Sequence, residues 1–402
     1  MKTMAAVIIL DGHLKSALAS VRSLGARGVT VLCGAERGTA PALHSRFVSE
    51  RFVYPSPKRH PRYFLAAVER TARALYERDG ERPVVFGFSD ATTLLLSRER
   101  DAFAEVATLP MPSAQSVETA ADKAATYTLA ESHRIPTIKT YGPSDFDSVA
   151  FPAIVKNRHS ILWRGETAVA GSARFVLSRE ELDDVYGRIT REATEAPLVQ
   201  DFIEGEEYGV EMACASGQPL AVFVHRRIRS LSPRGGAAVV KETAPATEQT
   251  ERMEHYARVL VRALSWEGPV MVEFKVERTT GAIYLMEING RFWGSLPLAI
   301  AAGVDFPWIA YERATGASQK LQAFAAHPAP MRTRHFLGDC KWLFAVFFAH
   351  DPLRSRLYPK RLSALYNFKM ELFRSKGDVF SLRDPLPSLM EYSDLIAKLI
   401  WK

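Results

Sequence analysis

Two glutamates that a predicted β-hairpin brings together are the most telling chemical feature of this chain. Two β-prone runs with alternating side chains, residues 270–276 and 283–288, flank the short segment 279–281. A three-residue loop that ends in glycine is typical of a hairpin built on a type I turn. Counting outward from that loop sets Glu273 opposite Glu287.

The same count sets Val276 opposite Tyr284 and places both glutamates on one face of the sheet. Like charges directly opposite each other destabilise a sheet unless a cation lies between them. Asn289 follows Glu287 by two residues and shares that face. Two carboxylates and an amide oxygen form the hard ligand set that Mg²⁺ takes when phosphates also hold it. The alternative is an ordinary edge hairpin with solvated glutamates, and residues elsewhere in the chain distinguish between these two interpretations.

Length and composition describe a globular protein. The 402 residues suggest two or three domains, and 47% hydrophobic with 24% charged residues are ordinary globular values. The sequence has no apolar run of about 18 residues, and its first apolar run is too short for a signal peptide. Three distant cysteines, Cys33, Cys214 and Cys340, indicate a reducing compartment. We therefore expect a cytoplasmic location.

The net charge of +7 is unevenly distributed. Residues 331–402 contain 13 Lys and Arg against 7 Asp and Glu, so the body before them is nearly neutral. A neutral body does not resemble a nucleic-acid binder. The basic, aromatic end suggests association with an anionic membrane or a membrane-bound partner, at the inner face of the membrane. The alternative is a helical extension that packs on the body with its charges solvated.

The first 112 residues alternate between predicted strands and helices, which favours a parallel α/β sheet. The first turn lacks GxGxxG, so a dinucleotide site is poorly supported. Asp11, His13, Ser89 and Asp90 follow predicted strands, where a ligand crevice forms in open α/β sheets. Capping of their own loops is an equal alternative for these residues. The strands are expected at 5–10, 29–33 and 83–88, and the helices at 14–24 and 62–78.

The next 200 residues contain the elements that must position the hairpin. We expect helices at 117–133, 178–193 and 247–264, strands at 151–156 and 198–203, and a hairpin of strands 210–215 and 220–228. Between them, residues 164–172 are small and polar and read as a loop. The strand at 151–156 ends in Lys156.

Residues 151–156, 198–207 and 286–291 resemble the ATP-grasp superfamily, and the resemblance extends over about residues 113–315. It implies an α/β fold with a parallel N-terminal pre-ATP-grasp domain at 1–112. A two-lobed ATP-grasp domain would follow at 113–315, with a lid-type subdomain at about 150–203. Residues 316–402 would form a basic, aromatic-rich helical extension.

The resemblance also implies a role for each candidate residue. Lysine supplies a point charge to phosphate, a carboxylate accepts from a ribose diol, and arginine offers a planar fork to a transferring phosphoryl group. Arg226 and Arg227 are neighbours on a strand, so only one of them can face the site. The implied roles are phosphate contact for Lys123 and Lys156, adenine contact for Gln200, Asp201, Phe202 and Ile203, ribose contact for Glu207, Mg²⁺ or Mn²⁺ ligation for Glu273, Glu287 and Asn289, and catalysis for Arg291 with Arg226 or Arg227.

The activity that the resemblance implies is an ATP-dependent ligase. ATP would phosphorylate a carboxylate to an acyl phosphate, and an amine would displace phosphate to give an amide. The expected partners are a small carboxylate and a small amine, with a homodimer as a further expectation. Two alternatives stay open: a silent nucleotide-binding regulatory or scaffold protein, and another ATP-grasp phosphoryl-transfer enzyme or carboxylase.

Overall fold

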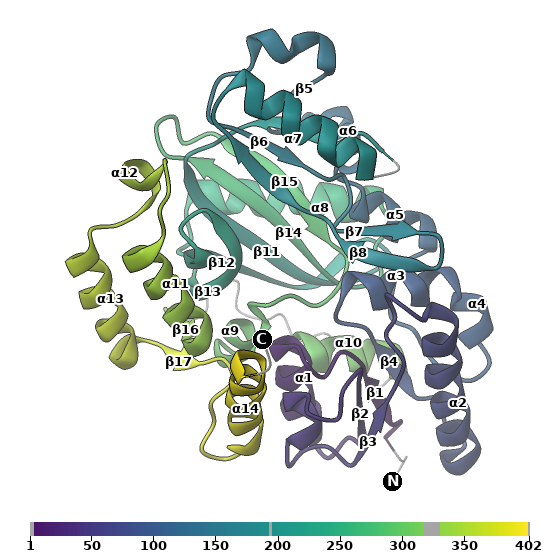
Figure 1. Cartoon of the computed structure of the whole chain (residues 1–402). Coiled ribbons are helices and arrows are strands. Elements are labelled where there is room, and N and C mark those ends of the chain that lie inside the picture. Colours follow the sequence, from purple (N-terminus) through teal and green to yellow (C-terminus); the bar gives the residue numbers. More distant parts are fainter. Residues whose placement is uncertain (1–3, 193–194, 317–329, 401–402) are drawn as a thin grey trace.

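The N-terminal region is a four-stranded parallel sheet in the order β3-β2-β1-β4. The computed structural model describes residues 4–192, 195–316 and 330–400 (Figure 1). Strands β1 and β2 are fully buried, as strands covered on both faces must be, and this confirms the expected parallel sheet. Its elements are β1 Val7–Ile9, β2 Val31–Ala35, β3 Glu50–Val53, β4 Val84–Phe86, α1 Lys15–Gly25, η1 Pro41–His44, α2 Pro61–Asp79, α3 Asp90–Arg98 and α4 Arg100–Phe103.

Asp11, at the end of β1, is committed to its own loops. It is buried, and its carboxylate accepts hydrogen bonds from the Phe88 and Ser89 N–H groups at 2.9 Å and from the Thr92 hydroxyl at 2.7 Å. Ser89 in turn caps α3. For these two residues, the contacts therefore support loop capping over ligand binding.

A four-stranded antiparallel lid sheet forms the second layer, at the top of Figure 1, in the order β5-β10-β6-β9. Residues 164–172, which we expected to be a loop, instead contribute to a β-hairpin of β7 and β8 that turns at Gly165. The elements are β5 Thr140–Tyr141, η2 Pro143–Ser148, β6 Ala153–Lys156, β7 Ile161–Arg164, β8 Thr167–Ala170, β9 Ala173–Val176, α7 Arg179–Glu192 and β10 Leu198–Asp201.

The single helix predicted at 117–133 is wrong. The chain forms α5 Ala114–Ala121 and α6 Lys123–Ser132, separated by Asp122 in an extended conformation. The Asp122 carboxylate accepts from the Ala124 N–H at 2.9 Å, as an N-cap residue does. This break places Lys123 in the first turn of α6.

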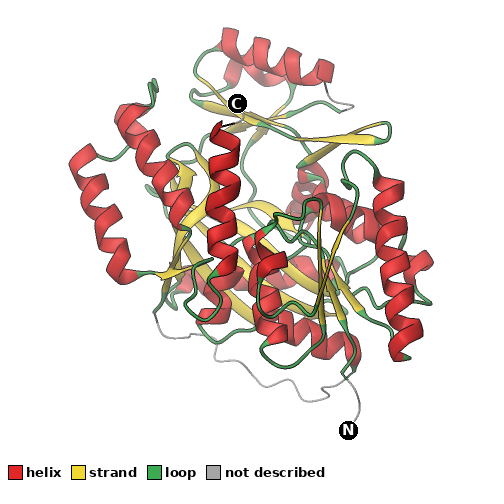
Figure 2. Ribbon diagram, turned by 60° about the horizontal axis from the view of Figure 1, so that its bottom comes forward, coloured by secondary structure: helices red, strands yellow, loops and turns green. Residues whose placement is uncertain are grey.

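A seven-stranded sheet forms the centre of the molecule, in the order β15-β14-β11-β12-β13-β16-β17. Helix α8 covers one face through Met253, Ala257 and Leu260, while α9 and α10 pack between the sheet and the N-terminal region. Figure 2 shows the helices flanking these strands. The elements are β11 Gly205–Ala215, β12 Gln218–Ser232, β13 Gly235–Thr243, α8 Glu248–Ala263, β14 Gly268–Glu277, β15 Ile283–Asn289, α9 Leu296–Ala301, α10 Phe306–Thr315, β16 Arg332–Arg334 and β17 Lys376–Gly377.

The C-terminal extension is mainly helical, as expected, but β16 and β17 also lengthen the central sheet. Its helices are α11 Phe336–Phe348, α12 Arg354–Leu357, α13 Arg361–Arg374 and α14 Leu386–Ile400. Buried Asp378 contacts Lys241 of β13 and Lys15 of α1, the latter at 2.8 Å. The extension is thus fixed to both other regions. The expected boundary after residue 315 adjoins 317–329, outside the described residues, and the domain limits stay a prediction.

Candidate functional site

The two glutamates pair directly across the hairpin, as predicted. Glu273 of β14 lies opposite Glu287 of β15, and we call them the acidic pair. The Asn289 side-chain nitrogen lies 3.2 Å from an oxygen of each glutamate. Arg227 contacts Glu273 at 3.1 Å, and Lys123 contacts Glu287 at 3.3 Å. Positive or donor groups from three elements therefore meet the acidic pair.

The hairpin loop is one residue longer than we expected. Val276 pairs with Ile283, so its predicted pairing with Tyr284 is wrong. A β-bulge then leaves Met286 as an extra residue on β15 and restores the acidic pair to direct opposition. The Met286 carbonyl accepts a hydrogen bond from the Tyr127 hydroxyl at 2.7 Å, which ties the bulge to α6.

The two members of the acidic pair differ in their tendency to ionise. Burial raises the pKa of Glu273, and Arg227 opposes this without cancelling it. Burial acts in the same direction on Glu287, but Lys123 and Lys156 outweigh it and hold the pKa of Glu287 at about 2. The Glu287 carboxylate is therefore ionised, whereas ionisation of the neighbouring Glu273 is disfavoured. A bound cation would stabilise the ionised form of both.

Two lysines from separate elements reach the same region. Lys156, at the end of β6, donates to the Tyr127 hydroxyl at 2.9 Å. Burial lowers the pKa of Lys156 to about 8, against the raising effect of Glu287. Lys123 also donates to the Ser160 hydroxyl at 3.2 Å. Both amines therefore stand close to Glu287, where phosphate oxygens could replace some of these partners.

A cavity of about 540 Å³, which we call the central cavity, gathers the predicted residues. Its wall comes from the lid sheet, the central sheet and α1. Of the residues that we predicted to form the site, those lining it are Lys123, Lys156, Gln200, Asp201, Phe202, Ile203, Glu207, Arg227, Glu273, Glu287, Asn289 and Arg291.

Arg226 is the one predicted site residue that does not line the central cavity. Adjacent strand residues point to opposite faces, and Arg226 turns toward Glu206 and Glu242 on the other face. Arg227 contacts Glu207 and Glu273 within the cavity. Of the two arginines between which the sequence could not choose, Arg227 is the one that lines the central cavity, and its catalytic role stays a prediction.

The segment after β10 presents unused backbone groups to the cavity. Among the described residues, the N–H and carbonyl groups of Phe202 and Ile203 have no hydrogen-bond partner. In contrast, the Gln200 amide donates to the Thr140 hydroxyl at 2.9 Å, and Asp201 accepts from Tyr141 at 2.7 Å. The backbone groups of Phe202 and Ile203 are therefore available to the edge of a flat heterocycle.

Glu207 lies where β11 enters the cavity. Lys275 donates to it at 3.0 Å, and Arg227 contacts its other oxygen. Burial would raise the pKa of Glu207, but these two cations outweigh it and lower the pKa. The carboxylate is therefore an ionised acceptor.

Several cavity residues escaped the sequence analysis. Lys15 of α1 reaches the cavity and donates to the Ala238 carbonyl at 3.2 Å. His225 lines it too, with its ring 2.8 Å from buried Glu211, which also accepts from Ser295. No local pattern marks these residues, because the fold brings them together from distant parts of the chain.

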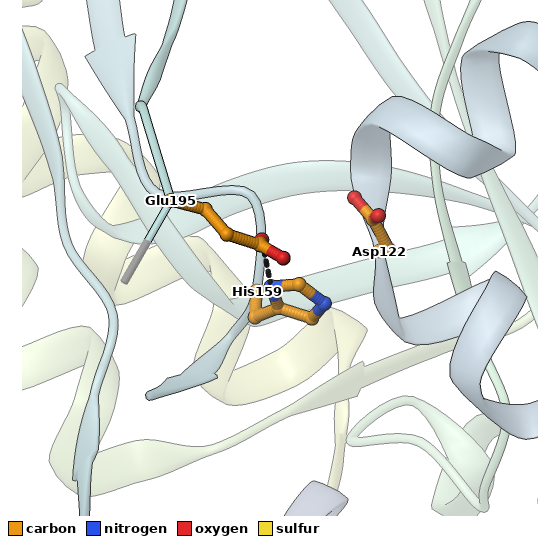
Figure 3. A group of neighbouring side chains, drawn as sticks. All are labelled: Asp122, His159 and Glu195. Carbon is orange, nitrogen blue, oxygen red and sulfur yellow. Dashed lines mark ion pairs between the residues drawn. The ribbon is translucent and has the colours of Figure 1, made fainter. Parts of the chain in front are cut away.

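A separate group of possible metal ligands lies where α6 meets the lid. Figure 3 shows Asp122, His159 and Glu195 facing one another, with an ion pair of 3.2 Å between the last two. The Arg158 guanidinium lies 3.0 Å from Asp122 and 3.5 Å from Glu195. Because Arg158 already supplies the positive charge, we interpret this group as an ion-pair cluster that joins α6 to the lid.

Arg291 lies beside the acidic pair and is held from the N-terminal region. Its guanidinium donates to Asp90 at 2.8 Å and to the Asn289 side-chain oxygen at 3.1 Å. Asp90, which the sequence left undecided, therefore positions an arginine of the cavity.

Comparison with known proteins agrees with this architecture. Residues 193–336 match the family model described as ATP-grasp in the biosynthetic pathway with Ter operon. A comparison with curated proteins finds no match. Similar solved structures include a biotin carboxylase from Campylobacter jejuni, with a TM-score of 0.64 and 16% identity over 83% of this chain and 76% of that one.

Two other similar structures are described as a synthetase and a ligase. N5-carboxyaminoimidazole synthetase from Staphylococcus aureus has a TM-score of 0.62 and 14% identity, over 84% of this chain and 83% of that one. The L-amino acid ligase from Bacillus licheniformis has a TM-score of 0.59 and 16% identity, over 84% and 81%. Such identities show a shared fold. Within this shared fold, residues 193–336, which include most of the central sheet, are similar to the ATP-grasp family.

Proposed function

We propose that this protein is a Mg²⁺-dependent ligase that uses ATP to activate a carboxylate as an acyl phosphate and joins it to an amine. The ATP-grasp family match over residues 193–336 and the fold shared with an L-amino acid ligase support an ATP-dependent ligase in general terms. The observation that carries the finer proposal is the acidic pair, held among Lys123, Arg227 and Asn289 inside one cavity.

The acidic pair and Asn289 fit a magnesium ion by the chemistry of their donors. The Asn289 amide nitrogen lies near both carboxylates and its oxygen accepts from Arg291, so binding of a metal by Asn289 would require the amide to rotate and to give up its hydrogen bond with Arg291. When bound there, Mg²⁺ or Mn²⁺ would neutralise negative charge on the β- and γ-phosphates of ATP.

The protein's own part is binding and positioning. The free backbone groups of Phe202 and Ile203 suit adenine, and Glu207 suits the ribose hydroxyls. Lys123 and Lys156 suit phosphate oxygens, and Gln200 and Asp201, which line the same wall as Phe202 and Ile203, stay predicted adenine contacts.

Arg291 and Arg227 suit the transferred phosphoryl group. Each is held in place before any substrate arrives, Arg291 by Asp90 and Arg227 by the two glutamates that it contacts. Donors fixed in advance stabilise developing charge without reorganisation. This chemistry needs no covalent nucleophile, and burial raises the pKa of Cys214 to about 12, which keeps that thiol protonated.

Release of ADP tests the proposal and separates it from its alternatives. The protein is incubated with ATP and Mg²⁺, and pools of carboxylates and amines are added alone and together. We expect ADP release that requires both pools, and a hydroxamate when hydroxylamine replaces the amine. Turnover with bicarbonate alone would favour a carboxylase instead. Tight ATP binding without turnover in any pool would favour a silent regulatory protein.

The location of the protein remains a matter for experiment. In the ranges that the structure describes, no helix has the length and apolar character needed to cross a membrane. We propose that the C-terminal extension binds anionic membrane surfaces, since α11 exposes Phe344 and Phe348 and α13 exposes Leu362, Tyr366 and Phe373. Flotation with anionic vesicles tests this, and equal flotation of a variant with Phe344, Phe348 and Phe373 changed to Ser would contradict it. Cytoplasmic location and homodimer formation stay predictions.

A further inference from the structure

A second cavity lies beside the central cavity, on the side of the C-terminal extension. Its volume is about 680 Å³, and we call it the arginine cavity. Phe202, Glu207, Arg227 and Lys275 line both cavities, so they form a shared wall. The far wall comes from α11, α12 and α13, which are absent from the lining of the central cavity. The volume is that of an ordinary small-molecule site.

The lining of the arginine cavity is strongly cationic. Cationic side chains outnumber carboxylates by about two to one, and they come from β12, β14, the hairpin loops, β16 and the helices of the extension. The cations are Arg226, Arg227, Arg229, Arg234, Lys275, Arg278, Arg332, Arg356 and Arg374, and the carboxylates are Glu204, Glu206, Glu207 and Glu371.

Some of these guanidinium groups are fixed from behind. Arg229 is 9% exposed, contacts Asp339 at 2.9 Å and lies over the Trp342 ring at 4.4 Å. Arg332 contacts Glu242 at 2.6 Å and Glu371 at 3.0 Å. These ion pairs fix the orientation of the arginine guanidinium groups around the cavity. Guanidinium groups held in fixed orientations recognise phosphate or carboxylate through paired, directional hydrogen bonds.

Other cations at the rim are not neutralised. Arg278, in the loop after β14, and Arg374, at the end of α13, form no salt bridge within the described part of the chain. Arg356 of α12 contacts Glu204 at 3.2 Å and lies over the Phe202 ring at 5.5 Å, and both charged side chains of this pair are partly exposed. Attachment of the extension does not require Arg278 or Arg374, because neither contacts an acidic partner. Their positive charge is therefore available to a ligand.

We propose that the arginine cavity binds a polyanionic small molecule, one that carries at least two phosphate or carboxylate groups. Lys123 and Lys156 do not line this cavity, so the ligand would be distinct from the phosphates of a nucleotide in the central cavity. It would sit beside the wall of Phe202 and Glu207. The inference goes beyond the proposed ligase function and does not depend on it.

Pyrophosphate is a suitable probe, titrated calorimetrically into the full-length protein without Mg²⁺, with and without saturating ADP. We expect one pyrophosphate to bind when ADP fills the central cavity, and pyrophosphate that binds in the central cavity without ADP to be displaced by ADP. The variant Arg278→Ala/Arg374→Ala should bind it about tenfold more weakly, since each loses a charge-assisted contact. The matched control is Lys369→Ala/Arg383→Ala, which removes two exposed cations of the extension outside the cavity and should bind within about twofold of the unmodified protein.

Three results would overturn the proposal: no binding of pyrophosphate, loss of all binding when ADP is present, or equal weakening in the two double variants. The second result would assign the anion to the central cavity, and the third would reduce the effect to overall charge. If ADP itself fails to bind, the nucleotide proposal is in error, while the comparison of the two variants still tests the arginine cavity. Melting temperatures of both variants confirm that they are folded.

Discussion

Arg227 and Arg226 offer a matched pair of substitutions, because they are adjacent on β12 and face opposite sides of the sheet. Arg227 is 15% exposed in its side chain and joins Glu207 to Glu273, whereas Arg226 is 30% exposed and joins Glu206 to Glu242. We compare Arg227→Met with Arg226→Met. Removing Arg227 leaves the partly buried Glu273 without its cation, whereas Glu207 keeps its contact with Lys275 at 3.0 Å.

The expected losses of unfolding free energy differ clearly. Breaking a buried ion pair by removing one partner costs about 3–5 kcal/mol; because these pairs are only partly buried and Glu207 keeps Lys275, Arg227→Met should lose about 3 kcal/mol, the low end of that range. Arg226→Met should lose only about 1 kcal/mol, because Glu206 is half exposed and Glu242 keeps a contact with Arg332 at 2.6 Å. Urea denaturation monitored by tryptophan fluorescence measures both losses.

Magnesium provides the second half of this experiment. Without Arg227, the pKa of Glu273 should rise further, since burial already raises it and the opposing cation is gone. Mg²⁺ at millimolar concentration should then stabilise Arg227→Met more than the unmodified protein, because it neutralises the same carboxylates. Equal losses in the two variants, or no extra stabilisation by Mg²⁺, would refute the reasoning.

Three further predictions follow from single contacts. Affinity for ATP should fall as pH rises through about 8, because burial lowers the pKa of Lys156 to that value and its amine loses its proton. Lys156→Arg should remove this dependence in a binding titration from pH 7 to pH 9.5, and an unchanged profile would contradict the phosphate role. Gly205→Ala should lower the melting temperature, since its Cβ would lie 1.9 Å from the Val276 carbonyl oxygen, and an unchanged melting temperature would contradict the tight β11–β14 pairing. Asp378→Asn should lower the free energy of unfolding by about 3 kcal/mol and speed proteolysis of the C-terminal extension, because Lys241 and Lys15 lose their shared carboxylate. An unchanged cleavage rate would show that other contacts hold the extension.

Local sequence patterns predicted the hairpin but not its details. Alternating β-prone residues around a glycine loop were sufficient to pair Glu273 with Glu287. The longer loop and the bulge at Met286 offset each other, and alternation carries no signal for either of them. The pairing was therefore predicted correctly although the adjacent pairing of Val276 was not.

Two other features that the sequence analysis did not predict, the helix break at Asp122 and the position of Lys15, have different physical causes. Asp122 breaks a helix because its carboxylate caps the next one, a choice that helical periodicity alone does not reveal. Lys15 reaches the central cavity because Asp378, far away in the sequence, holds it there. Contacts of that kind depend on how the three regions assemble, which no local pattern encodes.

Binding of Mn²⁺ tests most directly whether the acidic pair is a metal site. Electron paramagnetic resonance measures free Mn²⁺ in the presence of a non-hydrolysable ATP analogue, for the unmodified protein, Glu287→Gln and Glu277→Gln. Glu277 is a glutamate of the same hairpin that does not line the central cavity. We predict that Glu287→Gln stays folded but loses nucleotide-dependent Mn²⁺ binding and ATP turnover, while Glu277→Gln retains both. Undiminished Mn²⁺ binding by Glu287→Gln would contradict the assignment.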